Sequence, residues 1–202
     1  MYVSENFYLI ILYQIIMIIV VSGLPRSGTS MMMKMLEATG IDVLSDDVRE
    51  ADEDNLKGYY EDERVKQLHE DNSWIREAEN KAIKVISYQL QHLPSEYIYK
   101  VIFMQRSIRE VLASQRKMMQ RRGELQDDVS DNLMSKIFQK HLEETEHWIK
   151  VQPNMKTIYI SYNETLDDPK KTSEKISDFL GAELDVEKMV QIVDPRLYRQ
   201  KS

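Results

Sequence analysis

The sequence contains no cysteine. This absence excludes disulfide bonds, metal sites built on thiolates and a cysteine nucleophile. It also agrees with a reducing compartment, and we expect the protein to be cytoplasmic. No internal repeat and no low-complexity linker divides the 202 residues, a length that suits one α/β domain with a substantial core. We therefore predict a single domain over residues 1–202.

The chain also lacks an apolar run long enough to span a bilayer. Residues 8–21 are apolar except for Gln14, but they number 14, whereas a spanning helix needs about 20. Neither a basic flank nor a small-residue cleavage site marks a signal peptide at this end. We expect a first strand that begins at Met17 and an N-terminal extension over residues 1–16, with a membrane anchor as the less favoured alternative.

Acidic and basic residues are unevenly distributed along this chain of net charge −7. Residues 42–79 contain fourteen acidic and five basic side chains, a net of −9, whereas residues 81–122 contain nine basic and two acidic ones, a net of +7. Two interpretations are open: solvated faces of different helices, or a positive lobe for an anionic ligand that faces an acidic lobe where a second substrate enters. The overall acidity argues against nucleic acid as a partner.

Apolar runs alternate with helical patterns along the chain. Continuous runs rich in β-branched residues, rather than alternating ones, are typical of strands covered on both faces of a parallel sheet. The runs are residues 15–21, 82–86, 97–104 and 157–161, and the helical patterns are residues 29–39, 108–122, 130–152 and 170–180. Glycines that follow three of these patterns, at positions 40, 123 and 181, are expected to end the helices. The alternation predicts a three-layer α/β fold, a mainly parallel sheet with helices on both faces.

A short loop, residues 23–30, carries the strongest functional signal. Its sequence, Gly-Leu-Pro-Arg-Ser-Gly-Thr-Ser, joins the first apolar run to a helical pattern. A strand, a tight turn and a helix N-terminus form a phosphate cradle, because backbone N–H groups and the positive end of the helix dipole face the anion. The spacing is that of the loop G-x-x-x-x-G-K-[ST], but Thr29 occupies the lysine position and the cation is Arg26. An enzyme that acts on nucleoside triphosphates needs that lysine on the β- and γ-phosphates, so the sequence of this loop favours the binding of a single phosphate.

A second polar segment follows the third apolar run. Arg106 comes at the end of the run, and Ser114 lies eight residues later, about two helical turns, near the same side of a helix. An arginine fork with a hydroxyl suits a second, separate phosphate. Ligands of doubly wound sheets bind beyond the carboxyl ends of the strands, so this segment, residues 23–30 and the pair Tyr162-Asn163 should converge on one crevice.

Several of these segments resemble motifs of the sulfotransferase family, in the family's order and over residues 18–181. Pro-Arg-Ser-Gly-Thr-Ser at 25–30 is similar to the 5′-phosphosulfate loop, and residues 100–106, continued to Ser114, are similar to the 3′-phosphate motif. Residues 158–166, 168–169 and 179–181 are similar to the Y-E-D-L…D-P…F-L-G stretch. Residues 55–61 are similar to a G-[YF]-[YF]-E segment of bacterial members. The combination is more specific than any single motif.

The resemblance implies 3′-phosphoadenosine 5′-phosphosulfate (PAPS) as sulfuryl donor and adenosine 3′,5′-bisphosphate (PAP) as product, with no metal required. Its implied donor-binding residues are Arg26, Ser27, Gly28, Thr29 and Ser30 at the 5′-phosphosulfate, Arg106 and Ser114 at the 3′-phosphate, and Tyr162 near the adenine. Arg26 is also expected to be catalytic, because a permanently charged guanidinium stabilises negative charge on the leaving oxygen.

The acceptor, by the same resemblance, is a small-molecule or peptide-like hydroxyl or amine that needs a general base. Cytosolic members place a histidine just after a K-T dipeptide, but the matching residues 84–87, Lys-Val-Ile-Ser, contain none. A carboxylate must then serve, and we expect Glu61 to be the catalytic base, with Glu63 and Glu50 as alternatives.

The predicted function is therefore sulfuryl transfer from PAPS by in-line displacement. One alternative is a nucleotide kinase or hydrolase with a phosphate-binding loop; the missing lysine and the lack of a clear Mg²⁺-binding aspartate after a strand argue against it. Another is a non-catalytic PAP-binding protein of the same fold. It stays open because the histidine and the family's late glycine-rich loop are both missing.

Overall fold

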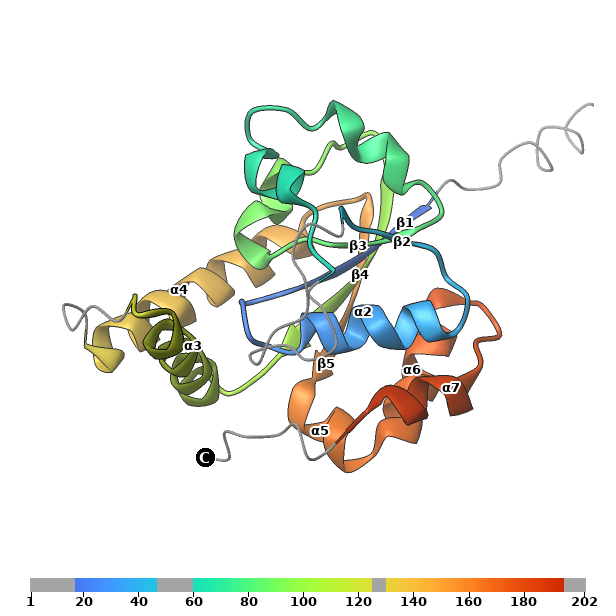
Figure 1. Cartoon of the computed structure of the whole chain (residues 1–202). Coiled ribbons are helices and arrows are strands. Elements are labelled where there is room, and N and C mark those ends of the chain that lie inside the picture. Colours follow the sequence, from blue (N-terminus) through green and yellow to red (C-terminus); the bar gives the residue numbers. More distant parts are fainter. Residues whose placement is uncertain (1–16, 47–59, 125–129, 195–202) are drawn as a thin grey trace, which may run out of the picture.

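Five parallel strands form the centre of the protein in the computed structural model, which describes residues 17–46, 60–124 and 130–194 (Figure 1). The strands are β1 (Met17–Gly23), β2 (Val43–Leu44), β3 (Ala82–Lys84), β4 (Ile98–Gln105) and β5 (Met155–Ser161). Their order is β2-β3-β1-β4-β5, and every neighbouring pair is parallel. The four predicted runs all form strands, which confirms the parallel α/β prediction.

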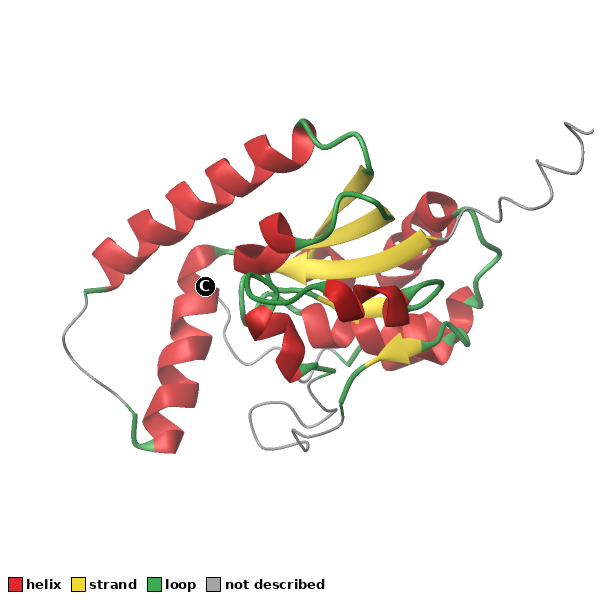
Figure 2. Cartoon of the chain, turned by 90° about the horizontal axis from the view of Figure 1, so that it is seen from above, coloured by secondary structure: helices red, strands yellow, loops and turns green. Residues whose placement is uncertain are grey.

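Helices cover both faces of the sheet (Figure 1; in Figure 2 helices are red and strands yellow). The α-helices are α2 (Thr29–Ala38), α3 (Ile108–Arg122), α4 (Asp131–Lys150), α5 (Tyr162–Asp167), α6 (Pro169–Leu180) and α7 (Val186–Ile192), and the 3₁₀ helices are η1 (Glu63–Gln67), η2 (Ser73–Ala78) and η3 (Ser87–His92). Side chains of β1 alternate between two cores: Ile19 packs with α2, α6 and α7, and Val20 packs with η2, η3 and the end of α4. The predicted three-layer arrangement is confirmed.

Local signals place the helix ends where the sequence predicts them. Gly123 and Gly181 have φ angles of 68° and 62° at the ends of α3 and α6, a left-handed conformation that glycine adopts without strain. Ser130 caps α4 by accepting a hydrogen bond from the Leu133 N–H.

Three short elements differ from the sequence prediction. β2 has two residues, too few for a periodic pattern, and pairs with β3. α5, to which the sequence prediction assigned no element, begins at Tyr162 directly after β5, where the Ser161 hydroxyl accepts from the Glu164 N–H and caps the helix. α7 was not predicted either; it is held by the packing of Met189 in the core with α2 and α6.

The carboxyl ends of β1, β3, β4 and β5 lie at one edge of the sheet. The chain turns from β3 back past β1 to β4, so β1 and β4 mark the point where the strand order reverses. This edge carries the loop 23–30, Arg106 and Tyr162, as expected. Among the described residues, no helix combines the length and the apolar character required to cross a bilayer.

Some predictions fall on residues that the structure does not describe. These are the N-terminal extension 1–16, the alternative base Glu50, residues 55–59 of the G-[YF]-[YF]-E resemblance and the tail 195–202. The single-domain assignment over residues 1–202 stays a prediction.

Candidate active site

The phosphate loop follows β1 with the backbone of a tight cradle. A turn closes where the Ser27 N–H donates to the Leu24 carbonyl at 3.1 Å, and Arg26 within it has a φ of 74°. Gly28 has a φ of 100° and immediately precedes α2. A Cβ at this position would lie 2.4 Å from a ring carbon of Tyr162. Glycine is therefore required at position 28 by both conformation and space.

Buried hydroxyls lie under this loop. Among the described residues, the Oγ atoms of Ser22 and Ser27 are buried and make no hydrogen bond. A buried polar atom without a partner costs free energy unless a ligand or ordered water satisfies it. The Ser27 hydroxyl and the N-terminus of α2 thus form a site whose chemistry fits a phosphate.

Two arginines, Arg26 and Arg106, meet between the phosphate loop and α3. Arg26 Nε donates to Ser114 Oγ at 3.0 Å, and Arg106 Nη1 donates to the Arg26 carbonyl at 3.1 Å. The structure thus brings together Arg26, Arg106 and Ser114, which the sequence assigned to two motifs 80 or more residues apart. Two cations and a hydroxyl at one edge form an anion-binding group beside the loop.

Arg106 is held in place by three neighbours. Its Nε donates to Glu110 Oε2 at 2.9 Å, and both side chains are buried. Asn163 donates to the other oxygen of Glu110 at 3.2 Å, and the guanidinium lies 4.4 Å from the centre of the Tyr162 ring. Asn163 thus lies in the crevice where the sequence predicted it, whereas Glu110 was not predicted; an acidic residue one helical turn after Arg106 was the available signal.

Tyr162 lies beneath the phosphate loop. Its ring, 8% exposed, packs against Gly28 and under Arg106. Burial raises the pKa of its hydroxyl, and the positive charge of Arg106 partly opposes this effect. The position of Tyr162 near an adenine stays a prediction.

Lys84 is a candidate site residue that the sequence prediction missed. It ends β3, opposite Val21 of β1, and its side chain is 5% exposed. Its Nζ donates to Glu61 Oε1 at 3.0 Å and to Ser30 Oγ at 3.3 Å. A lysine within the apolar run 82–86 was the signal, because a buried ammonium is retained only where it has partners. Lys84 joins the candidate base to the phosphate loop.

The structure also separates Glu61 from its rivals. The Glu63 carboxylate binds Lys66, an exposed lysine three residues later, at 2.6 Å. Glu50 lies outside the described residues. Of the two described candidates, only Glu61 contacts a residue of the site.

A histidine approaches the end of β3 from another part of the chain. His141 of α4 forms a hydrogen bond of 2.8 Å with Ser87 Oγ and stacks on Tyr88, with ring centres 3.7 Å apart. Burial lowers the pKa of the imidazole, and the Glu144 carboxylate opposes this effect. The segment 84–87 lacks a histidine in sequence, but the fold supplies one next to it.

This histidine predicts a pH dependence of stability. Its pKa is lower in the folded than in the unfolded protein, so the unfolded chain takes up the proton first as the pH falls below about 6.5. The free energy of unfolding should therefore decrease on acidification, by at most about 1.4 kcal/mol per pH unit from this group. Urea unfolding of the wild type and of His141→Gln at pH 7.5 and pH 5.5 measures it. An equal acid loss in both proteins would exclude His141 as the cause.

Comparisons with known proteins bear on this site and fold. A family model described as "Sulfotransferase domain" matches residues 18–201. The chain belongs to the sulfotransferase family. The match includes the phosphate loop, Lys84, Arg106 and the elements that follow them. No curated protein sequence matches this sulfotransferase.

Solved sulfotransferases share the fold. The sulfotransferase domain of the Synechococcus PCC 7002 olefin synthase has a TM-score of 0.55 at 15% identity, with 92% of this chain and 88% of that chain covered. Mouse SULT7A1, solved as a complex with PAP, has a TM-score of 0.53 at 18% identity, with 89% and 63% covered. The sulfotransferase domain from the curacin biosynthetic pathway has a TM-score of 0.50 at 13% identity, with 88% and 77% covered. At these identities the likeness concerns the fold alone.

Proposed function

We propose that this sulfotransferase moves a sulfuryl group from PAPS to a hydroxyl or amine of a small-molecule or peptide-like acceptor. The observation that carries this proposal is the meeting of two anion-binding groups, where Arg26 of the phosphate loop contacts Ser114 of α3 at 3.0 Å. A nucleoside with phosphates on both its 3′ and 5′ oxygens fits such a pair. A triphosphate, whose charges follow one chain, does not need the second group.

On the donor side, PAPS would supply a sulfuryl group activated by its linkage to the 5′-phosphate. The backbone of residues 27–30, the N-terminus of α2 and the buried Ser27 hydroxyl bind the 5′-phosphate. Arg106 and Ser114 bind the 3′-phosphate, and the Arg106 guanidinium is held by its hydrogen bond to Glu110 and by the Tyr162 ring. Arg26 stabilises the negative charge that develops on the leaving oxygen.

On the acceptor side, Lys84 and Glu61 act as a pair. The sulfur–oxygen bond to the donor breaks as a bond from sulfur to the acceptor atom forms in line, and the acceptor proton passes to the Glu61 carboxylate. The Lys84 ammonium contacts both Glu61 and Ser30, so it lies between the base and the phosphate loop. There it stabilises charge on the transferring oxygens.

Thermal-shift titration tests the donor assignment. We expect PAP to raise the free energy of unfolding by about 2.7 kcal/mol at a hundredfold excess over Kd, and AMP to need much higher concentrations because it lacks the 3′-phosphate. A shift with Mg·ATP but not with PAP would overturn the assignment in favour of a kinase or hydrolase.

Catalysis is measured separately, as PAP released from PAPS with water or with a panel of phenols, alcohols and amines as acceptor. If the protein binds PAP but releases none from PAPS with any of these acceptors, a non-catalytic binding protein is favoured. If the Glu61→Gln variant retains the wild-type kcat, Glu61 is not the base.

A further inference from the structure

We propose that Asp46, together with the ion pair between Asp62 and Arg64, positions the Glu61 carboxylate against Lys84. The inference rests on the proposed function, in which Glu61 accepts the proton of the acceptor. We class these residues as positioning residues, since the contacts that carry the argument are made to Glu61 and to its neighbours in the chain.

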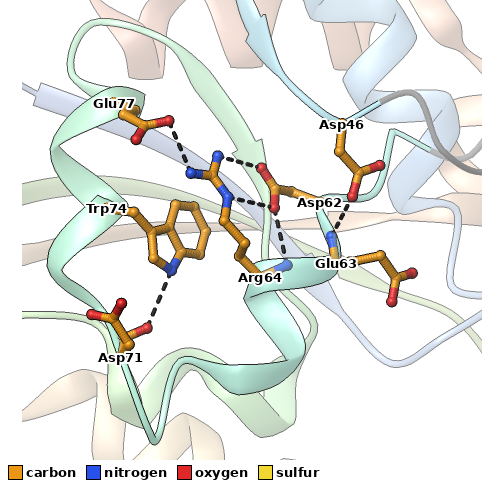
Figure 3. Close-up of polar contacts among 7 residues, drawn as sticks. All are labelled: Asp46, Asp62, Glu63, Arg64, Asp71, Trp74 and Glu77. Carbon is orange, nitrogen blue, oxygen red and sulfur yellow. Dashed lines mark hydrogen bonds and ion pairs between the residues drawn. The ribbon is translucent and has the colours of Figure 1, made fainter.

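Asp46 holds the backbone on both sides of Asp62, the residue that follows Glu61. Its own N–H donates to the Glu61 carbonyl at 3.1 Å, and its carboxylate accepts from the Glu63 N–H at 2.6 Å (Figure 3). Asp46 lies two residues after β2, and β2 pairs with β3, the strand that ends in Lys84. One residue therefore ties the candidate base to the same part of the sheet as its cationic partner.

Asp62 sets the direction in which Glu61 points. Its carboxylate, 1% exposed, accepts two hydrogen bonds from the Arg64 guanidinium, Nε at 3.0 Å and Nη2 at 2.8 Å (Figure 3). The backbone of Asp62 is extended, with φ −120° and ψ 119°, and neighbouring side chains of an extended chain point to opposite sides. Drawing Asp62 inward to Arg64 therefore turns Glu61 to the other side, where Lys84 lies.

Arg64 is itself fixed by aromatic and ionic contacts. Its guanidinium lies 4.3 Å from the centre of the Trp74 ring, and its Nη1 donates to Glu77 at 3.0 Å (Figure 3). Trp74 is buried, and its indole N–H donates to the Asp71 carbonyl. A bidentate pair stacked on a buried ring leaves Asp62 little freedom.

Tyr60 fixes the chain on the other side. It has a φ of 52°, in the left-handed region that a bulky residue seldom adopts, and its hydroxyl donates to Glu37 of α2. Strained backbone of this kind persists where the surrounding contacts determine it, often next to functional groups. Glu61 is thus held between a contact to α2 and contacts to β2 and η1.

The first experiment compares Asp46→Ala with Asp46→Asn. Alanine removes the acceptor of the Glu63 N–H, whereas asparagine keeps an oxygen in its place. We expect Asp46→Ala to lower kcat for PAP release from PAPS about 10-fold, because a displaced base loses rate steeply, with KM for PAPS and Kd for PAP within about 2-fold of wild type. Asp46→Asn should lose no more than about 3-fold. Equal losses in both variants would overturn the proposal.

The second experiment repeats Asp46→Ala in a Glu61→Gln background. A residue that acts through Glu61 has nothing left to position there, so the second loss should shrink to less than about 2-fold. The same 10-fold loss in both backgrounds would show that Asp46 acts on overall structure and would overturn the proposal. Asp62→Asn should follow the pattern of Asp46→Ala.

The outcomes separate this inference from the proposed function. If Glu61→Gln lowers kcat and Asp46→Ala does not, the function stands and the positioning role fails. If Glu61→Gln keeps wild-type kcat, or the wild type binds PAP but shows no turnover, the assignment of Glu61 as the base fails and the positioning role fails with it.

Discussion

Replacing Lys84 with methionine is expected to lower kcat about 10²- to 10³-fold, the loss usually found when one charge-stabilising donor is removed from an active site. The Lys84 ammonium contacts Glu61 at 3.0 Å and Ser30 at 3.3 Å, so its loss affects both the base and the transferring group. PAP lacks the sulfuryl group, so its Kd should change less than about 10-fold. Initial rates of PAP release and calorimetric titration with PAP measure the two quantities.

Lys100→Met is the matched control for this change. Lys100 is also a partly buried strand lysine, but it lies opposite Ile19 within β4 and donates to the Leu180 carbonyl, away from the carboxyl edge of the sheet. We expect it to lower the free energy of unfolding and to leave kcat unchanged. A similar loss of kcat in both variants would show that the effect of Lys84→Met comes from general destabilisation.

Arg106→Ala is expected to reduce the preference for PAP over AMP by about 10- to 150-fold, which corresponds to the 1.5–3 kcal/mol of hydrogen bonds to a charged group. The guanidinium lies beside Ser114 and Arg26, where we place the 3′-phosphate, and AMP has no group there. The ratio of the two Kd values, measured by calorimetry on the folded protein, isolates this contact from any loss of stability.

Two further variants keep this prediction decisive. Arg106→Ala leaves the buried Glu110 carboxylate without its partner and will destabilise the fold, so Arg106→Lys, which keeps the charge but not the fork, gives a second measurement. Arg109→Ala changes an exposed arginine on the same helix and should leave the ratio intact. An unchanged ratio in both Arg106 variants would place the 3′-phosphate elsewhere.

Much of the fold could be predicted because its signals are local. Apolar runs of β-branched residues, a serine or aspartate before a helix and a glycine after it act through backbone geometry within a few residues. The phosphate loop belongs to the same class, since a strand, a turn and a helix N-terminus make the cradle by themselves. The two-residue β2 and the helix α7 were missed because neighbouring elements, not their own pattern, hold them.

The site could be predicted only in part. Residues of the two phosphate motifs were identified from spacing and resemblance, and the structure brings Arg26, Arg106 and Ser114 into contact. The role of Lys84 could not be predicted, because its partners Glu61 and Ser30 lie 23 and 54 residues away and only the fold brings them together. His141 could not be placed at Ser87 from sequence, since 54 residues separate them and only the packing of α4 brings them together.

The sequence by itself determined the phosphate loop, with Arg26 in place of the usual lysine position, because a strand, a glycine turn and a helix start depend only on adjacent residues. The tertiary structure alone decided which of many acidic side chains faces that loop. The Glu61 carboxylate contacts Lys84, 23 residues further along the chain. In our proposal, the direction of the Glu61 side chain is set by Asp46 and by the ion pair between the buried Asp62 and Arg64. Such contacts depend on how strands and helices pack, which no local pattern specifies.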